Sequence, residues 1–210
     1  MLENEIGLRL GIFWSVLTIF ALCEYIFPKR KLHIGKNVRW VCNISLIIID
    51  NMIVRLIVPF TAASVAVYAQ RNQIGLLHLV SLPLSASVTV SVVLLDLLIY
   101  AQHVLFHHVP LFWRVHKVHH IDQEIDVTTG LRFHPIEIVL STLIKCVAVL
   151  LLGIPLMAII LFEIFLNVTS MFNHGNINLP VRLDKFLRLI VVTPDMHRIH
   201  HSVLGEETNS

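Results

Sequence analysis

Residues 138–172 decide the fold and read IVLSTLIKCVAVLLLGIPLMAIILFEIFLNVTSMF. Nearly every side chain in this run is apolar, and the run is much longer than the roughly 20 residues that one helix needs to span a membrane. Gly153-Ile154-Pro155 lies near its middle, and glycine and proline mark breaks in helices. We therefore expect a helical hairpin that dips into a membrane and comes back on the same side.

Three more apolar segments precede the hairpin, at about residues 7–27, 41–69 and 76–102, and each is long enough to cross a bilayer. The chain is 56% hydrophobic and 14% charged, whereas soluble domains carry about 25% charged residues. The sequence therefore predicts an all-α fold, an integral-membrane bundle of three spanning helices plus the hairpin, with a histidine-rich helical cap on the cytoplasmic side. We expect one membrane domain over residues 1–210, with its N-terminal membrane helices within 1–95.

Positive charge between the first two apolar segments sets the expected orientation. Residues 29–39 carry five Lys and Arg side chains in a short loop, and such loops face the cytoplasm. The N-terminus, MLENE, is acidic where a signal peptide would be basic, so we expect the first segment to stay as an anchor. A net charge of +2 is too small to indicate a nucleic-acid partner.

We assign structural roles, and not functional ones, to the three cysteines and to the charged residues of the second apolar segment. Cys23, Cys42 and Cys146 lack metal-ligand spacing, and we expect them to be small buried side chains that form no disulfide. Asp50 and Arg55 lie within the second segment, where charges are expensive and usually paired, so we expect an ion pair between them.

Histidine is the unusual residue of this chain, because 11 of its 13 histidines fall between His103 and His201. Most of them form three boxes: an HxxxH box, His103–His107, and two HxxHH boxes, His116–His120 and His197–His201. On a helix, residues at i, i+3 and i+4 project together, so each box can present its imidazoles to one metal region. Asp96 and Tyr100 share the helix face of His103 and His107.

Nine imidazoles are candidate metal ligands, and they comprise the boxes and an isolated histidine: His103, His107, His116, His119, His120, His174, His197, His200 and His201. One first-row metal accepts about four to six ligands, so nine suit two metals that keep open positions for oxygen. Imidazole serves iron, zinc and copper alike, so the ligand type leaves the metal open. We expect His33 and His78, outside the cluster, to have structural or solvent-exposed roles.

Together these boxes resemble those of the fatty acid hydroxylase/sterol desaturase family. Intermediate motifs are similar too, namely LFWRVHK at 111–117, RFHP at 132–135 and HGN at 174–176. The resemblance covers residues 96–210, the expected catalytic region. It implies a non-haem di-iron centre that uses O2 to hydroxylate or desaturate a sterol-like, hopanoid, carotenoid or acyl lipid on the cytoplasmic side. It further implies an electron donor of cytochrome b5 or ferredoxin type.

The resemblance also implies roles for individual residues. The nine histidines, His174 among them, are the expected iron ligands, and His108 and His134 are expected to orient ligands or hold water. Asp96 would accept an N–H from a ligand histidine, and Tyr100 would gate or line the site. Family members usually continue beyond the last box with further conserved segments, so we expect the C-terminus to be truncated. Two alternatives stay open: a histidine-rich membrane metal-handling protein, and an inactive family member.

Overall fold

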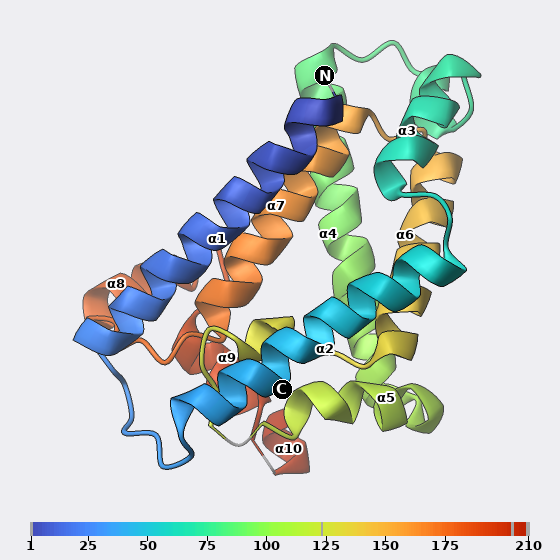
Figure 1. Ribbon diagram of the computed structural model, residues 1–210. Helices are drawn as coiled ribbons and strands as arrows, with labels where there is room; N and C mark the ends of the chain where they lie inside the picture. The colour runs from blue at the N-terminus through green and yellow to red at the C-terminus, as the bar shows by residue number, and fades with distance from the viewer. Residues whose placement is uncertain (1, 123, 203, 209–210) are drawn as a thin grey trace. The chain divides into compact units, whose positions relative to one another are not determined.

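The computed structural model describes residues 2–122, 124–202 and 204–208 (Figure 1). The described residues form helices and no strand, apart from an isolated antiparallel bridge between Pro28 and Ile177. This confirms the predicted all-α fold. The helices are α1 (Leu2–Ile26), α2 (Lys36–Ile57), α3 (Ala62–Arg71), η1 (Leu76–Leu79), α4 (Leu84–His108), α5 (Pro110–His120), η2 (Thr129–Leu131), α6 (Pro135–Leu152), α7 (Leu156–Asn173), α8 (Val181–Leu187), α9 (Pro194–His200) and α10 (Gly205–Thr208). Met1 and residues 209–210 lie outside the described residues. The expectations of a retained N-terminal anchor and a truncated C-terminus rest partly on them.

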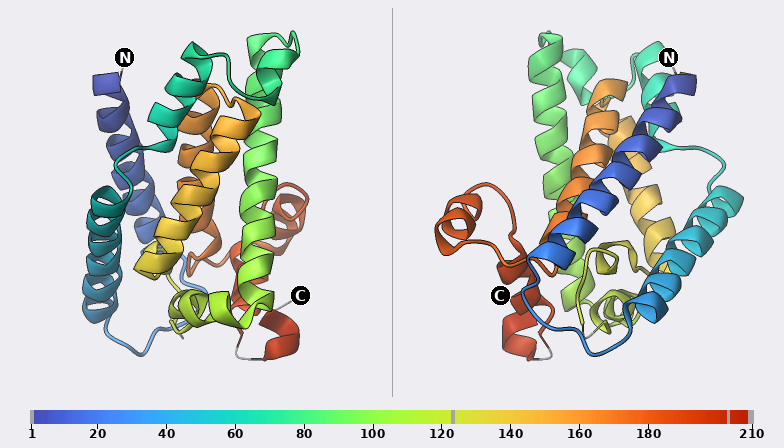
Figure 2. Two further views of the ribbon diagram at one scale, coloured as in Figure 1. Left: turned by 90° about the vertical axis from the view of Figure 1, so that its right-hand side faces the viewer. Right: turned by 60° about the vertical axis from the view of Figure 1, so that its left-hand side comes forward.

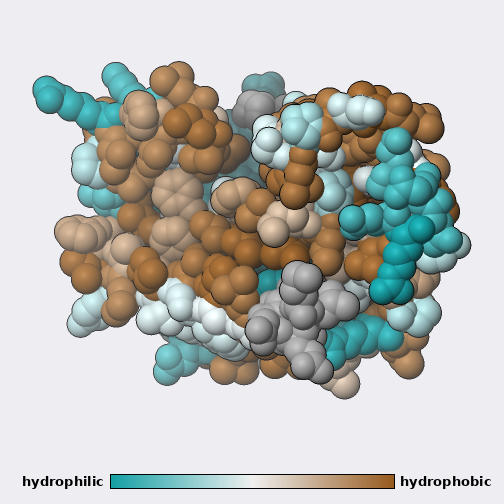
Figure 3. All heavy atoms as spheres, turned by 90° about the horizontal axis from the view of Figure 1, so that it is seen from above, coloured by the Kyte–Doolittle hydropathy of each residue, from teal (hydrophilic) through white to brown (hydrophobic). Residues whose placement is uncertain are grey.

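Five stretches among the described residues are long and apolar enough to cross a membrane: Gly7–Ile26, Lys36–Leu79, Leu84–His108, Pro135–Leu152 and Leu156–Asn173. Their large apolar side chains are often exposed, such as Leu56 at 84% and Trp14 at 54%. Hydrophobic side chains also cover much of the face seen in Figure 3. Soluble proteins seldom expose apolar surface on this scale, so the exposed side chains are those of an integral-membrane helical protein.

The chain divides into two compact units. Unit 1 comprises residues 1–47, 117–132 and 164–210, and unit 2 comprises residues 48–116 and 133–163. The boundary between the units falls inside α2, α5 and α7, as well as between η2 and α6. Each unit is therefore assembled from segments that are distant in sequence.

The predicted hairpin break is present in unit 2, where α6 ends at Leu152 and α7 begins at Leu156. Gly153 has a φ of +69°, a left-handed conformation that favours glycine at a helix C-terminus. A Cβ on Gly153 would lie 2.7 Å from the His78 ring, and one on Gly75 would lie 2.1 Å from the Gly153 nitrogen. The two glycines therefore allow the turn and the backbone before η1 to approach closely. An ion pair between Lys145 and Glu163 joins α6 to α7.

The second apolar segment differs from the expectation of a single helix, because α2 ends at Ile57 and α3 begins at Ala62. Pro59 accounts for the break, since proline lacks the N–H of a helix interior and clashes with the preceding turn. Thr61 then caps α3 by accepting a hydrogen bond from the Ser64 N–H. In unit 2, α3 lies against α6 and buries its alanines (Figures 1 and 2).

Two structural expectations about charges and cysteines need correction. Asp50 is buried, whereas Arg55 is exposed, and they form no ion pair among the described residues. Five positions separate the two on α2, so their side chains do not share a face as i and i+4 residues do. All three cysteines are free, as expected, but Cys146 alone of them is buried, because Cys42 lies on an exposed face of α2 and Cys23 is partly exposed.

A hydrophobic core in unit 1 positions the histidine-bearing segments. Leu17 on α1 and Met171 on α7 pack together with Val127 and Leu131, which lie in the segment between α5 and α6. Phe20 on α1 also packs against Phe172, with 5.8 Å between the ring centroids. The segment after His119 and the end of α7 before His174 are therefore packed against α1.

Candidate metal centre

Four predicted ligands meet in unit 1. His119 lies on α5, His174 follows α7, and His197 and His201 lie on α9 and at its C-terminal end. One ring nitrogen from each lies within 4.8 Å of those from the others. His119, His174 and His201 are buried. Histidines from three separate segments therefore converge on one small volume.

Backbone carbonyls fix the orientation of two of these imidazoles. Nδ1 of His119 lies 3.0 Å from the Arg132 carbonyl oxygen, and Nδ1 of His174 lies 2.7 Å from the Ser170 carbonyl oxygen. A carbonyl oxygen only accepts hydrogen bonds, so Nδ1 carries the proton in both rings. In a neutral imidazole the Nε2 atom then holds a lone pair. Both Nε2 atoms are therefore ready to donate that lone pair to a metal.

The spacing of the Nε2 atoms fits a shared cation. Nε2 of His174 lies 3.0 Å from Nε2 of His119 and 2.9 Å from Nε2 of His197. Two lone pairs that face each other at this distance repel unless a positive charge lies between them. Metal–imidazole bonds are about 2.1 Å long, so nitrogens on one metal ion that meet near right angles lie about 3 Å apart. The arrangement thus suits a metal with several imidazole ligands.

His201 is held in its neutral form. Burial, and after it the imidazoles around the ring, lowers the pKa of His201 far below its usual value. Neither ring nitrogen of His201 has a hydrogen-bond partner among the described residues. A neutral imidazole is the form that binds a metal, and a ligand ion would satisfy a buried polar atom that is otherwise costly.

The remaining predicted ligands of unit 1, His120 and His200, border this cluster. The rings of His120 and His201 stack with 4.2 Å between their centroids and an interplanar angle of 15°. The His200 ring lies 4.9 Å from that of His120 and 5.2 Å from that of His197. Six of the nine predicted ligands therefore lie together in unit 1.

The other three predicted ligands lie together in unit 2. His103 and His107 lie one turn apart on α4, with ring centroids 4.7 Å apart, and the His116 ring of α5 lies 4.8 and 4.9 Å from them. Nδ1 of His116 lies 2.7 Å from the buried carboxylate of Glu137 on α6. A carboxylate in this position orients an imidazole and raises its basicity as a ligand.

Glu137 is a site residue that sequence reasoning missed, and so are the carbonyl groups of Arg132 and Ser170. The signal for Glu137 was an acidic residue at the first turn of an apolar helix, three positions after His134. Nothing in the sequence links it to His116, which lies 21 positions away. Backbone carbonyls leave no signal at all, because every residue carries one.

Other predicted residues lie at the edges of these clusters. His134 caps α6 by accepting a hydrogen bond from the Ile136 N–H at 3.1 Å, and Nδ1 of His108 bonds to the Val104 carbonyl of its own helix at 2.8 Å. Asp96 and Tyr100 are exposed on α4, and within the described residues Asp96 forms no hydrogen bond or ion pair. Outside the clusters, His33 bonds to Glu124.

Polar contacts also hold α9. Lys29 forms an ion pair with Asp195 at 2.7 Å, and Arg198 pairs with the same carboxylate. Burial would raise the pKa of Asp195, but the hydrogen bond and charge of Lys29, and then Arg198, lower it below its usual value. Asp195 therefore stays ionised, and it holds the helix that carries the third box against the loop after α1.

The family model for fatty acid hydroxylases matches residues 88–209. The chain belongs to the fatty acid hydroxylase family. All nine candidate ligands of this family member lie inside the matched region, as do Asp96, Tyr100 and Glu137, whereas α1, α2 and α3 lie outside it. The family membership that the boxes predicted is thus confirmed.

A curated relative of this fatty acid hydroxylase is similar over part of the chain. Ornithine lipid hydroxylase OlsE from Rhizobium tropici is 28% identical over 128 residues, which are 61% of this chain and 38% of that protein. The match therefore spans well under half of the relative's length. No solved structure matches the chain.

Proposed function

We propose that the protein is a membrane-bound, O2-dependent lipid hydroxylase or desaturase with a non-haem di-iron centre. The observation that carries this proposal is the convergence of one ring nitrogen each from His119, His174, His197 and His201, with the Nε2 atoms of His119 and His174 3.0 Å apart. Family membership supports oxidation of a lipid, and the relative named as an ornithine lipid hydroxylase favours an acyl lipid over the sterol-like, hopanoid and carotenoid alternatives.

We assign two iron ions to the nine histidines on the basis of their number and box spacing: His103, His107, His116, His119, His120, His174, His197, His200 and His201. When bound, such ions activate O2 so that hydrogen is removed from an unactivated C–H bond of the lipid, which yields a hydroxyl group or a double bond. Reducing equivalents would come from a donor of cytochrome b5 or ferredoxin type.

The chain's own residues prepare the site. The carbonyls of Arg132 and Ser170 and the carboxylate of Glu137 hold Nδ1–H groups, so each ring presents Nε2 as the ligand atom. Tyr100 keeps its proposed role as a residue that lines the site. Asp96 accepts no hydrogen bond from a ligand imidazole among the described residues, so we propose its acceptor role for the metal-bound protein alone. The exposed apolar surface of the membrane helices gives a lipid direct access to the protein.

The metal content of the detergent-purified protein, measured by elemental analysis under anaerobic reducing conditions, tests this proposal. We expect about two iron ions per chain, a number that nine imidazoles and open oxygen positions would fit. The iron-loaded protein should then consume O2 only when lipid and a reductant are both present. Zinc or copper that iron cannot replace would instead indicate a metal-handling protein. Two iron ions without O2 consumption, when acyl, sterol-like, hopanoid and carotenoid lipids are each tested with a reductant, would indicate an inactive family member.

A further inference from the structure

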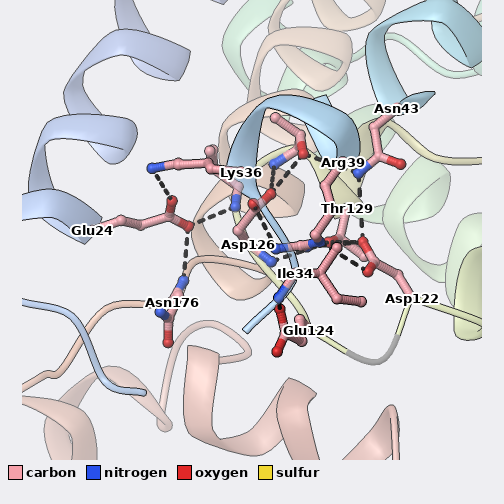
Figure 4. A network of polar contacts seen from close by, with 12 residues as sticks. Glu24, Ile34, Lys36, Arg39, Asn43, Asp122, Glu124, Asp126, Thr129 and Asn176 are labelled. Carbon is pink, nitrogen blue, oxygen red and sulfur yellow. Dashed lines mark hydrogen bonds and ion pairs between the residues drawn. The ribbon is translucent and has the colours of Figure 1, made fainter. Parts of the chain in front are cut away.

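The helices before the matched region contribute buried polar side chains to unit 1. Glu24 on α1 and Arg39 and Asn43 on α2 are 5%, 6% and 0% exposed. Figure 4 shows that all three point toward segments that follow a proposed metal ligand. Burying polar groups is costly unless their hydrogen bonds are satisfied, so their partners indicate what these side chains hold in place.

Glu24 joins the backbone of two histidine-bearing segments. Its Oε1 atom accepts a hydrogen bond from the Val127 N–H at 2.6 Å and another from the Asn176 N–H at 2.8 Å. Val127 belongs to the segment that follows the second box, and Asn176 lies two residues after His174. One carboxylate oxygen therefore fixes the distance between the two segments (Figure 4).

Arg39 holds the segment after the second box from another direction. Its guanidinium bonds to both oxygens of Asp122, at 3.2 and 3.0 Å, and forms an ion pair with Asp126 at 2.9 Å. Bidentate contacts of this kind fix orientation as well as distance. Arg39 thus restrains both ends of a short stretch of backbone that begins two residues after His120.

Asn43 connects most directly to a ligand. Its Oδ1 atom accepts a hydrogen bond from Nη1 of Arg132 at 2.9 Å, and its Nδ2 donates to the Thr128 hydroxyl at 2.9 Å. Nε of Arg132 donates to the Val118 carbonyl at 2.9 Å. The carbonyl of the same Arg132 accepts the Nδ1–H of His119. Asn43 therefore holds the residue that orients His119.

We propose that Glu24, Arg39 and Asn43 form a buried polar clamp, which positions His119 and His174 for metal binding. They are positioning residues, since each acts through backbone or side-chain partners of the ligands. The clamp rests on the proposed function, in that these histidines bind metal. It assigns a role in the metal centre to α1 and α2, which lie outside the family match.

Titration of the full-length protein in detergent with Co(II) tests the clamp, because Co(II) binds imidazole sites and its visible absorption reports ligand geometry. Asn43→Leu removes the side-chain hydrogen bonds of Asn43, including a longer one from its Nδ2 to Asp122 at 3.4 Å, at similar volume. Asn43→Asp keeps the acceptor for Arg132 but loses the donor to Thr128, whose hydroxyl already donates to Asp126. Asn37→Leu, at an exposed position of the same helix, is the matched control. The thermal unfolding of each metal-free variant shows whether it is folded.

We expect Asn43→Leu to bind Co(II) roughly 10- to 100-fold more weakly, the range seen when a partner of a metal ligand is lost, with an altered absorption spectrum. Asn43→Asp, which keeps the contact with Arg132, should bind more tightly than Asn43→Leu, and Asn37→Leu should equal the wild type. A folded Asn43→Leu with wild-type affinity would overturn the clamp, as would an Asn37→Leu variant as weak as Asn43→Leu.

If Asn43→Leu does not fold, Glu24→Gln decides the question. It keeps an acceptor oxygen but loses the charge that strengthens both backbone hydrogen bonds, so we expect affinity to fall by about fivefold. Unchanged affinity would overturn the clamp. Failure of the clamp can be distinguished from failure of the metal centre. A wild-type protein that binds neither Co(II) nor iron refutes the metal centre, and the clamp with it. A wild-type protein that binds Co(II), together with folded clamp variants of unchanged affinity, refutes the clamp alone.

Discussion

Within the unit 1 cluster, both ring nitrogens of His119 make close contacts. Its Nδ1–H is held by the Arg132 carbonyl, and its Nε2 lies 3.0 Å from that of His174. His119→Ala should therefore abolish metal loading and turnover together, a larger loss than the roughly 10- to 100-fold that follows from changing a partner of a ligand. His200→Ala should have the same effect. Elemental analysis checks both, and His33→Ala is the control, which should keep wild-type metal content.

Glu137 carries the second prediction at this scale. Its carboxylate orients His116 at 2.7 Å inside a buried environment. Glu137→Ala should therefore weaken metal binding by roughly 10- to 100-fold, whereas Glu137→Gln, which retains an acceptor oxygen, should weaken it less. Metal titration compares the affinities of the wild type, Glu137→Ala and Glu137→Gln, with the exposed Glu206→Ala as control. Equal metal affinity in all four proteins would mean that Glu137 has a packing role and does not orient His116 for metal binding.

The site could be predicted at the level of donors and not at the level of their orientation. Box spacing placed eight imidazoles and the family resemblance added His174, and the structure gathers six of the nine in one unit and three in the other. Glu137 and the Ser170 carbonyl escaped prediction because they approach the ligands through the fold. His134 shows the converse: its ring has a local task, capping α6, that a box pattern does not reveal.

At the scale of elements, proline and glycine decided where apolar runs break. The hairpin was predictable from Gly153 and Pro155, because the run exceeds one span and has these breakers at its middle. The break between α2 and α3 at Pro59 was missed, because the apolar pattern continues through it and hydropathy outweighed the local backbone effect. Apolar patterning therefore predicted the membrane helices better than their ends.

The turn between α6 and α7 makes a prediction about stability. Gly153→Ala should destabilise the protein by about 1 kcal/mol or more, because the backbone there has a φ of +69° and a Cβ would meet the His78 ring and the Ile74 carbonyl oxygen. Thermal unfolding in detergent measures the effect. Gly11→Ala on α1 is the control, since a Cβ there meets nothing within 4 Å. If Gly153→Ala unfolds at the same temperature as Gly11→Ala, the turn accommodates the added Cβ without loss of stability, which contradicts the prediction.

At the scale of the whole molecule, the family match and the metal centre do not cover the same residues. The match begins at residue 88, yet the histidine-bearing segments of unit 1 are held by side chains from α1 and α2. Sequence reasoning assigned residues 1–95 to membrane anchoring, because a buried Glu24 or Asn43 in an apolar helix gives no sign of its distant partner. The contacts of unit 1 extend the role of these helices from anchoring to positioning.

Orientation in the membrane is the last property that can be tested on the whole chain. The five Lys and Arg side chains of residues 29–39 favour a cytoplasmic location for that loop. The alternation of membrane segments expected from the sequence predicts residues 70–73 on the other side. In a protein whose three cysteines are replaced, Lys31→Cys should react with a membrane-impermeant thiol reagent only in inside-out vesicles. Arg71→Cys should react in intact cells. Both positions are exposed. Labelling of Lys31→Cys from outside would put the loop, and Asp195 that pairs with its Lys29, beyond the reach of a cytoplasmic electron donor.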